Sequence, residues 1–183
     1  MGEWQNLGHL GPKKFQCGFC GMIVGSDKGY SLGGSTWRIC ICPHCDKPTY
    51  FENSKQYPAA VFGNQVNGLP SKEIESLYNE ARRCTSVQAY TAAVLACRKL
   101  LMNIAVQKGA DEGKKFIEYV EYLADRGYVP PNGKGWVDHI RKKGNEATHE
   151  IALMSEDDAK DLITFIEMLL KFIYEFPSKI TPK

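Results

Sequence analysis

The pattern of apolar and polar positions changes about one third of the way along the chain. Up to residue 51, short runs of aromatic and β-branched residues alternate with glycine-rich turns, as in 21–25 and 35–39. Runs of this kind between turn residues predict short β-strands. The next stretch, 53–70, holds two prolines, two glycines and three asparagines without a helical period. It therefore predicts a linker.

Beyond residue 70 the apolar positions recur at helical spacing. Ser71 is the expected N-cap of the first helix, because its hydroxyl can accept a hydrogen bond from the first turn. The segment 86–107 is the expected central core helix, with an apolar stripe that includes Val87 and Leu95. The predicted helices are 71–83, 86–107, 114–125, 134–149 and 155–177, the last of them stopped by Pro177.

Four of the seven cysteines form two CxxC pairs, Cys17 with Cys20 and Cys42 with Cys45. Each CxxC turn presents two sulfurs, and zinc takes four ligands in a tetrahedron. A hairpin that brings the two turns together would close a four-thiolate shell. The spacing therefore predicts one structural zinc ion per chain, with no open position for catalysis. Gly18 and Gly21 are expected to allow positive backbone angles in the first turn.

Two other side chains compete for the metal. Cys40 lies outside the second CxxC pair, and His44 lies inside that turn, where it points away if its neighbours bind. Free or redox-active thiols are the other interpretation, but redox CxxC pairs prefer a strand-to-helix context that is absent here. The four-cysteine set is therefore favoured, and Cys84 and Cys97 are interpreted as buried, inert thiols.

Together these patterns predict a mainly α protein, a five-helix bundle behind a small N-terminal β zinc ribbon. The expected organisation is a zinc ribbon over 1–53, a linker over 54–70 and a helical domain over 71–183. A chain of 183 residues is long enough for one sizeable core and one small module.

Charge and the start of the chain exclude several classes of function. Lys and Arg exceed Asp and Glu by two in total, and four zinc-bound thiolates would cancel that excess. Strong nucleic-acid binding therefore gains no support from charge. The chain has no long uncharged apolar stretch and no secretory signal, and Asn6 stands where a myristoylation motif needs Ser or Thr. We expect a cytoplasmic protein without membrane contact.

Two segments carry a resemblance to a known family. They are Ala-Tyr-Thr-Ala-Ala-Val-Leu-Ala-Cys-Arg at 89–98 and Ile-Arg-Lys-Lys-Gly-Asn-Glu-Ala-Thr-His at 140–149. Through them, residues 69–176 resemble a bacterial domain-of-unknown-function family that is grouped with the HEPN superfamily and found in defence and restriction-associated proteins. Many HEPN members are metal-independent endoribonucleases whose site is completed across a symmetric dimer. The resemblance implies a homodimer and a partner that is RNA or a defence-system protein.

The HEPN motif is an arginine, a polar residue, three further residues and a histidine on one helix. Asn145 and His149 match the polar residue and the histidine, and Gly144 stands at the arginine position. In RNA cleavage of this kind His149 would exchange a proton with the ribose 2′-hydroxyl, for which its unperturbed pKa near 6.5 is suited. Asn145 would orient the reacting groups.

Three cations precede the motif and would oppose the phosphate charge: Arg141, Lys142 and Lys143. On a helix, Lys142 lies about 20° from the face of His149, whereas Arg141 lies roughly 80° round the axis. A partner chain could supply the more distant guanidinium.

Two functions remain open at this stage. One is an endoribonuclease of toxin or antiviral type, with the ribbon selecting nucleic acid or a partner. The other is a non-catalytic dimeric adaptor that binds protein or nucleic acid, which the glycine at the arginine position and the neutral charge favour. His149 and Asn145 are also compatible with a structural role, in which they cap or cross-link helices.

Overall fold

The computed structural model describes residues 3–129, 135, 137–140 and 153–180. The chain divides into two compact units, Met1–Val61 and Phe62–Lys183, which we call the β unit and the helical unit. Each is described by itself.

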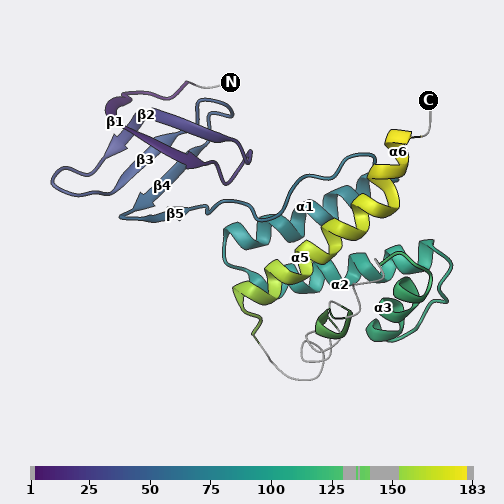
Figure 1. Cartoon of the computed structure of the whole chain (residues 1–183). Helices are drawn as coiled ribbons and strands as arrows, with labels where there is room; N and C mark the ends of the chain where they lie inside the picture. Colours follow the sequence, from purple (N-terminus) through teal and green to yellow (C-terminus); the bar gives the residue numbers. More distant parts are fainter. Residues whose placement is uncertain (1–2, 130–134, 136, 141–152, 181–183) are drawn as a thin grey trace. The chain divides into compact units, whose positions relative to one another are not determined.

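The β unit is one antiparallel sheet in which neighbours in sequence are neighbours in space (Figure 1). Short turns allow this order, because antiparallel strands can be joined by hairpins. The strands are β1 Gly8–Gln16, β2 Ile23–Ser31, β3 Arg38–Ile41, β4 Pro48–Glu52 and β5 Lys55–Tyr57.

The core of the β unit is very small. The rings of Phe15 and Phe51 meet edge to face, with centroids 5.1 Å apart. Cys17, Cys40 and Cys42 are the other fully buried members of this cluster. Because so few apolar side chains are buried, packing alone gives the unit little stability.

The prediction of a mainly α protein built as a five-helix bundle is wrong. Strands account for 19% of the structure and helices for about 46%, because β1 and β2 are nine residues long rather than short. Both are rich in Gly and Lys, which are poor strand formers, so cross-strand pairing overrides residue propensity here. The position of the sheet at the N-terminus agrees with the prediction.

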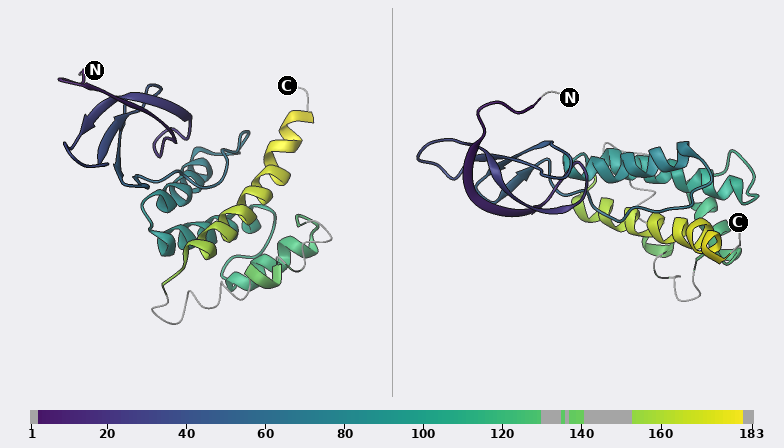
Figure 2. Two further views of the ribbon diagram at one scale, coloured as in Figure 1. Left: turned by 60° about the vertical axis from the view of Figure 1, so that its left-hand side comes forward. Right: turned by 90° about the horizontal axis from the view of Figure 1, so that it is seen from above.

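In the helical unit, α2 lies at the centre. It contacts α1, α3 and α5, and its Leu100, Leu101 and Ile104 are fully buried (Figures 1 and 2). The prediction of a central core helix is confirmed. The helices are α1 Lys72–Ser86, α2 Tyr90–Gln107, α3 Phe116–Asp125, α5 Glu156–Leu170 and α6 Phe176–Ile180, with a π-helical turn at Lys171–Glu175.

The boundary between α1 and α2 differs from the prediction. The Ser71 hydroxyl caps α1 as expected, accepting the N–H of Ile74 at 3.3 Å. However, α1 continues through Ser86, and Gln88 then adopts a φ of 61°. A left-handed residue ends a helix, so the second helix begins only after this turn.

The apolar stripe predicted for the central helix was partly misplaced. Val87 falls in the turn and is 65% exposed, and Leu95 is 49% exposed. The last helix also differs, because Pro177 lies inside α6 instead of stopping it. Helical backbone is continuous from α5 through Lys171–Glu175 into α6. A proline inside such a run removes one backbone hydrogen bond, and the π-helical turn just before Pro177 is the local departure from α-helical geometry there.

The two faces of α2 give the first test. Leu101→Ala should lower the free energy of unfolding of the helical unit by about 2–5 kcal/mol, because it leaves a cavity in the core. Leu95→Ala on the same helix should change it by less than about 0.5 kcal/mol. Urea unfolding followed by circular dichroism at 222 nm measures both values. Equal losses would contradict the assigned face.

Candidate metal centre

The first cysteine pair sits in the turn between β1 and β2. The N–H of Cys17 donates to the carbonyl oxygen of Met22 at 2.9 Å, and the N–H of Gly21 donates to that of Cys17 at 2.8 Å. These two bonds close the turn and hold Cys20 beside Cys17.

The second pair repeats this arrangement between β3 and β4. The N–H of Cys42 donates to Lys47 at 3.0 Å, and the N–H of Asp46 donates to Cys42 at 2.9 Å. The offsets along the chain are the same in both turns. Gly21 (φ 74°) and Asp46 (φ 55°) occupy equivalent positions and both adopt left-handed backbone angles. Asp is one of the few residues besides Gly that tolerates this region.

Backbone N–H groups also point at the sulfurs. The amide of Phe19 donates to Cys17 Sγ at 3.4 Å. Amides of the second turn and of the residues that follow each pair donate in the same way: Met22 to Cys20, His44 and Cys45 to Cys42, and Lys47 to Cys45. Donors of this kind favour the charged thiolate over the thiol.

The four sulfurs form a compact group. Cys17 Sγ lies 3.7 Å from Cys45 Sγ, and Cys20 Sγ lies 3.8 Å from Cys42 Sγ. All four sulfurs lie within 4.8 Å of one another. A tetrahedron with metal–sulfur bonds of about 2.3 Å has edges of about 3.8 Å. Two of the sulfur–sulfur distances match this edge, and the four sulfurs together are close enough to surround one metal ion.

The thiols differ in acidity because their surroundings differ. Burial raises the pKa of Cys45 to about 12, and hydrogen bonds to the other thiols act in the same direction. Burial also acts to raise the pKa of Cys42, but hydrogen bonds with the amides of His44 and Cys45 and with the thiols of Cys45 and Cys17 together outweigh it, so that this pKa is lowered. A metal ion bound here would displace the remaining protons, so that its affinity would rise with pH.

Gly18 is needed for a different reason from the one predicted. Its backbone angles are not left-handed. Instead, a Cβ at this position would lie 2.4 Å from the carbonyl oxygen of Ala59 and 2.7 Å from that of Pro58. The segment that follows β5 thus passes directly over the first cysteine turn, and only glycine allows this approach.

The two competing ligands lie outside the sulfur group. Cys40 is fully buried in β3, packed in the small core, and burial raises its pKa. His44 is exposed in the second turn. In the helical unit, Cys97 is fully buried and Cys84 is partly buried.

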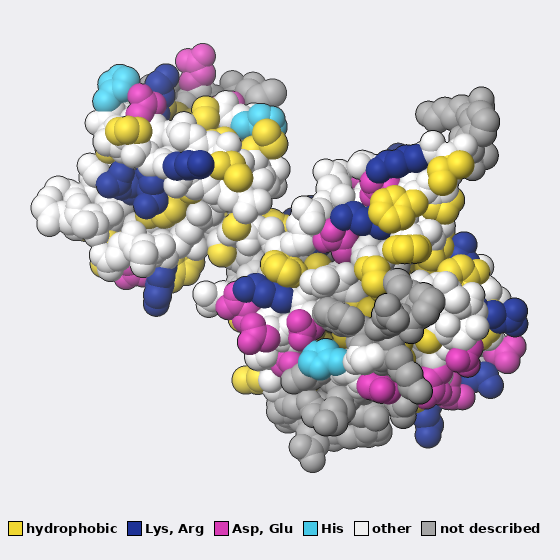
Figure 3. Space-filling view, in the orientation of Figure 1, with side chains coloured by type: hydrophobic (Ala, Val, Ile, Leu, Met, Phe, Trp, Pro, Cys, Tyr) yellow, Lys and Arg dark blue, Asp and Glu magenta, His cyan; other side chains and the backbone are white. Residues whose placement is uncertain are grey.

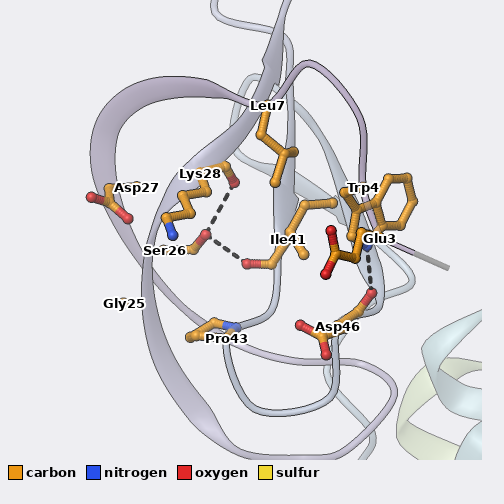
Figure 4. A pocket seen from close by; sticks show the side chains of 10 residues that line it. All are labelled: Glu3, Trp4, Leu7, Gly25, Ser26, Asp27, Lys28, Ile41, Pro43 and Asp46. Atoms are coloured by element: carbon orange, nitrogen blue, oxygen red, sulfur yellow. Dashed lines mark hydrogen bonds between the residues drawn. The ribbon is translucent and has the colours of Figure 1, made fainter. Parts of the chain in front are cut away.

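The N-terminal segment packs on the β unit, which the sequence did not indicate. The indole N–H of Trp4 donates to the carbonyl oxygen of Asp46 at 2.9 Å (Figure 4). The Tyr30 hydroxyl donates to the carbonyl oxygen of Gln5. The segment borders a pocket whose other walls include Ile41 and Pro43. It ties the second cysteine turn to residues far away in sequence.

The predicted catalytic residues lie outside the described part of the chain. They are Arg141, Lys142, Lys143, Asn145 and His149. Just before them, residues 137–140 are helical, and His139 Nε2 lies 2.8 Å from a carboxylate oxygen of Asp161 in α5.

Together, the sheet with its four clustered cysteines and the helical unit define a two-part protein with a potential metal-binding β module. The chain matches the family described as "Domain of unknown function (DUF4145)" over residues 79–182, more than half of its length. It therefore belongs to this family. The comparison with curated proteins and the comparison with solved structures found no match. Among the described residues, no helix has the length and apolar character needed to cross a membrane.

The close approach at Gly18 gives a direct test of this centre. Gly18→Ala should destabilise the β unit by about 1–3 kcal/mol, because the new methyl group meets backbone atoms that cannot rotate away. Gly25→Ala is the matched control, since a Cβ there meets nothing within 4 Å. Scanning calorimetry would measure the midpoint of the β-unit transition. If both variants melt together with the parent chain, the described packing over the first turn is incorrect.

Proposed function

We propose that the four cysteines hold one zinc ion whose role is structural. A tetrahedral set of four sulfurs is typical of zinc or of iron–sulfur sites, and paired CxxC turns with matching hydrogen bonds suit a single ion. Four thiolates close the shell, so that no position is left for a reacting water. The β unit has only a small core, and metal binding supplies folding free energy. The role of the ion is therefore to stabilise this unit.

Elemental analysis tests the identity of the metal. The purified chain should contain about one zinc ion per chain. Cys17→Ser or Cys45→Ser should lose the ion and unfold the β unit, while circular dichroism of the helices stays nearly unchanged. Cys40→Ala should keep its zinc, because this thiol is not a ligand. Iron in place of zinc, or full zinc in the Cys17→Ser chain, would contradict the proposal.

We further propose that the protein acts on RNA as a metal-independent endoribonuclease of HEPN type, working as a homodimer. The observation that carries this proposal is the pair Asn145 and His149, four residues apart within the matched family region. Side chains at this spacing share one face of a helix. Upstream cations are available to oppose charge on a phosphate.

In this reaction the ribose 2′-oxygen bonds to the adjacent phosphorus, and the bond to the 5′-oxygen breaks. The products are a cyclic phosphate and a 5′-hydroxyl. His149 takes the proton of the 2′-hydroxyl and returns one to the leaving oxygen, which a group with a pKa near 6.5 can do at neutral pH. Asn145 orients these groups, and the cations at 141–143 stabilise the negative charge on the phosphate.

Cleavage of RNA in magnesium-free buffer tests the enzyme. The parent chain should give products with cyclic phosphate ends, and His149→Ala should slow cleavage by about 10²–10⁴-fold, the usual contribution of a general acid or base. His139→Ala is the control, because His139 lies outside the motif and its imidazole is paired with Asp161 of α5. Equal cutting by the parent and His149→Ala chains would exclude this mechanism.

One specific observation favours a second function. Gly144 stands where HEPN nucleases carry their arginine, and a guanidinium is the better shaped group for phosphate charge. The alternative is a non-catalytic dimeric adaptor, in which the β unit binds nucleic acid or a protein. A chain that binds RNA but never cuts it would support this alternative.

A further inference from the structure

The outer face of the β-unit sheet carries an unusual row of side chains. Tyr30 of β2 pairs with Ile39 of β3, Ile39 pairs with Tyr50 of β4, and Tyr50 pairs with Tyr57 of β5. Residues directly opposite one another in neighbouring strands share a face of the sheet. These four positions, which we call the aromatic row, therefore run straight across four strands.

Two tryptophans lie beside the row, and two of its tyrosines stack on each other. Trp37 meets Tyr50 edge on with centroids 6.4 Å apart, and Tyr50 stacks on Tyr57 with centroids 6.0 Å apart and planes inclined by 26°. At the other end Trp4 lies 6.5 Å from Tyr30. The row therefore carries aromatic rings at both of its ends, with Ile39 of β3 between Tyr30 and Tyr50.

The row is not needed for the core. The opposite face of the same strands carries Cys40 and Phe51, which are buried with Phe15. By contrast, Trp37 and Tyr57 are each 40% exposed. The solvated face of an antiparallel sheet is normally polar, and contiguous exposed apolar surface marks a binding site. Figure 3 shows exposed hydrophobic side chains on the β unit with Lys and Arg side chains among them.

The charges beside the row fit an anionic chain with aromatic bases. Side chains two positions apart along a strand share a face, which places Lys28 near the Tyr30 end and Lys55 near the Tyr57 end. Glu52 shares this face beside Tyr50 and lies directly opposite Lys55 in the β4–β5 ladder, where it offsets part of the charge of that cation. The two cations flank the aromatic centre, an order that matches phosphates on either side of stacked bases.

We propose that the aromatic row is a stacking surface for unpaired bases of single-stranded RNA. The choice of RNA rests on the function proposed above. Three strand spacings of about 4.8 Å give the row a width of about 14 Å, and aromatic side chains on a four-stranded sheet typically stack two or three bases. Duplex bases are excluded, because their faces are already covered by their neighbours. Stacking, with little help from charge, provides most of the affinity.

Fluorescence anisotropy with a labelled ten-nucleotide oligouridine tests this inference. All variants carry His149→Ala so that cleavage does not consume the probe. Replacing Trp37 and Tyr57 together by Ala should weaken binding by at least about tenfold, the effect expected for loss of stacking. Replacing both by Phe should keep the affinity within about twofold. Phe19→Ala, which removes another exposed ring of the β unit, should have no effect.

Two further readouts separate stacking from charge and from misfolding. If Lys28 and Lys55 contact two phosphates, the logarithm of affinity should fall against the logarithm of salt with a slope of only about −1.4. Bound RNA should quench the tryptophan fluorescence of the parent chain more than that of Trp37→Phe. A double variant that has lost its zinc is misfolded. In that case the single variants Trp37→Ala and Tyr57→Leu are measured instead.

The outcomes distinguish this inference from the proposed enzyme. No binding of the oligouridine, equal binding by the Ala and parent chains, or equal affinity for a duplex of the same length would overturn the inference. A protein that binds to the row in place of RNA would give the first of these results. If His149→Ala abolishes cleavage and the Trp37 and Tyr57 Ala variants still bind RNA normally, the proposed enzyme is supported and RNA binding by the aromatic row is excluded. If His149→Ala leaves cleavage unchanged and the Ala variants lose RNA binding, the aromatic row is supported and the proposed enzyme mechanism is excluded.

Discussion

The convergence of four sulfurs from two turns is the constraint on which the β unit depends. Each turn closes through its own backbone hydrogen bonds, but few apolar contacts hold one turn against the other. An ion bound between them would link β1 and β2 to β3 and β4 at one point. The sheet, the segment that passes over Gly18 and the N-terminal segment tied to Asp46 all lie around this point.

This arrangement leaves the two faces of the sheet free for different tasks. The inner face is occupied by the phenylalanines and the buried Cys40, and the metal centre would replace the rest of a larger core. The outer face carries Trp37 and Tyr57, each 40% exposed, and these are the side chains proposed to bind RNA. The helical unit has its own core around α2, so that recognition and the proposed chemistry belong to separate folding units.

The sequence was most informative where local spacing determines the structure. The CxxC spacing indicated the four cysteines that the structure brings together, and Ser71 marked the start of α1. It was least informative where distant contacts decide. The length of β1 and β2 depends on pairing with neighbouring strands, and the exposure of Leu95 depends on where α1 and α5 lie. The role of Gly18 depends on residues about forty positions away, which no local pattern reveals.

The aromatic row was missed for the same reason. Its three tyrosines and Ile39 lie on four different strands, and only the register of those strands aligns them. By contrast, Asn145 and His149 form a local motif that the sequence alone reveals. The catalytic role proposed for this pair is argued from the sequence.

X-ray absorption at the zinc edge is the most direct test of the central claim. A closed four-cysteine site predicts a first shell of four sulfur atoms at about 2.3 Å, with no nitrogen or oxygen ligand. A shell of three sulfurs with one nitrogen, as binding by His44 would give, or a water oxygen in the fourth position, would contradict the account.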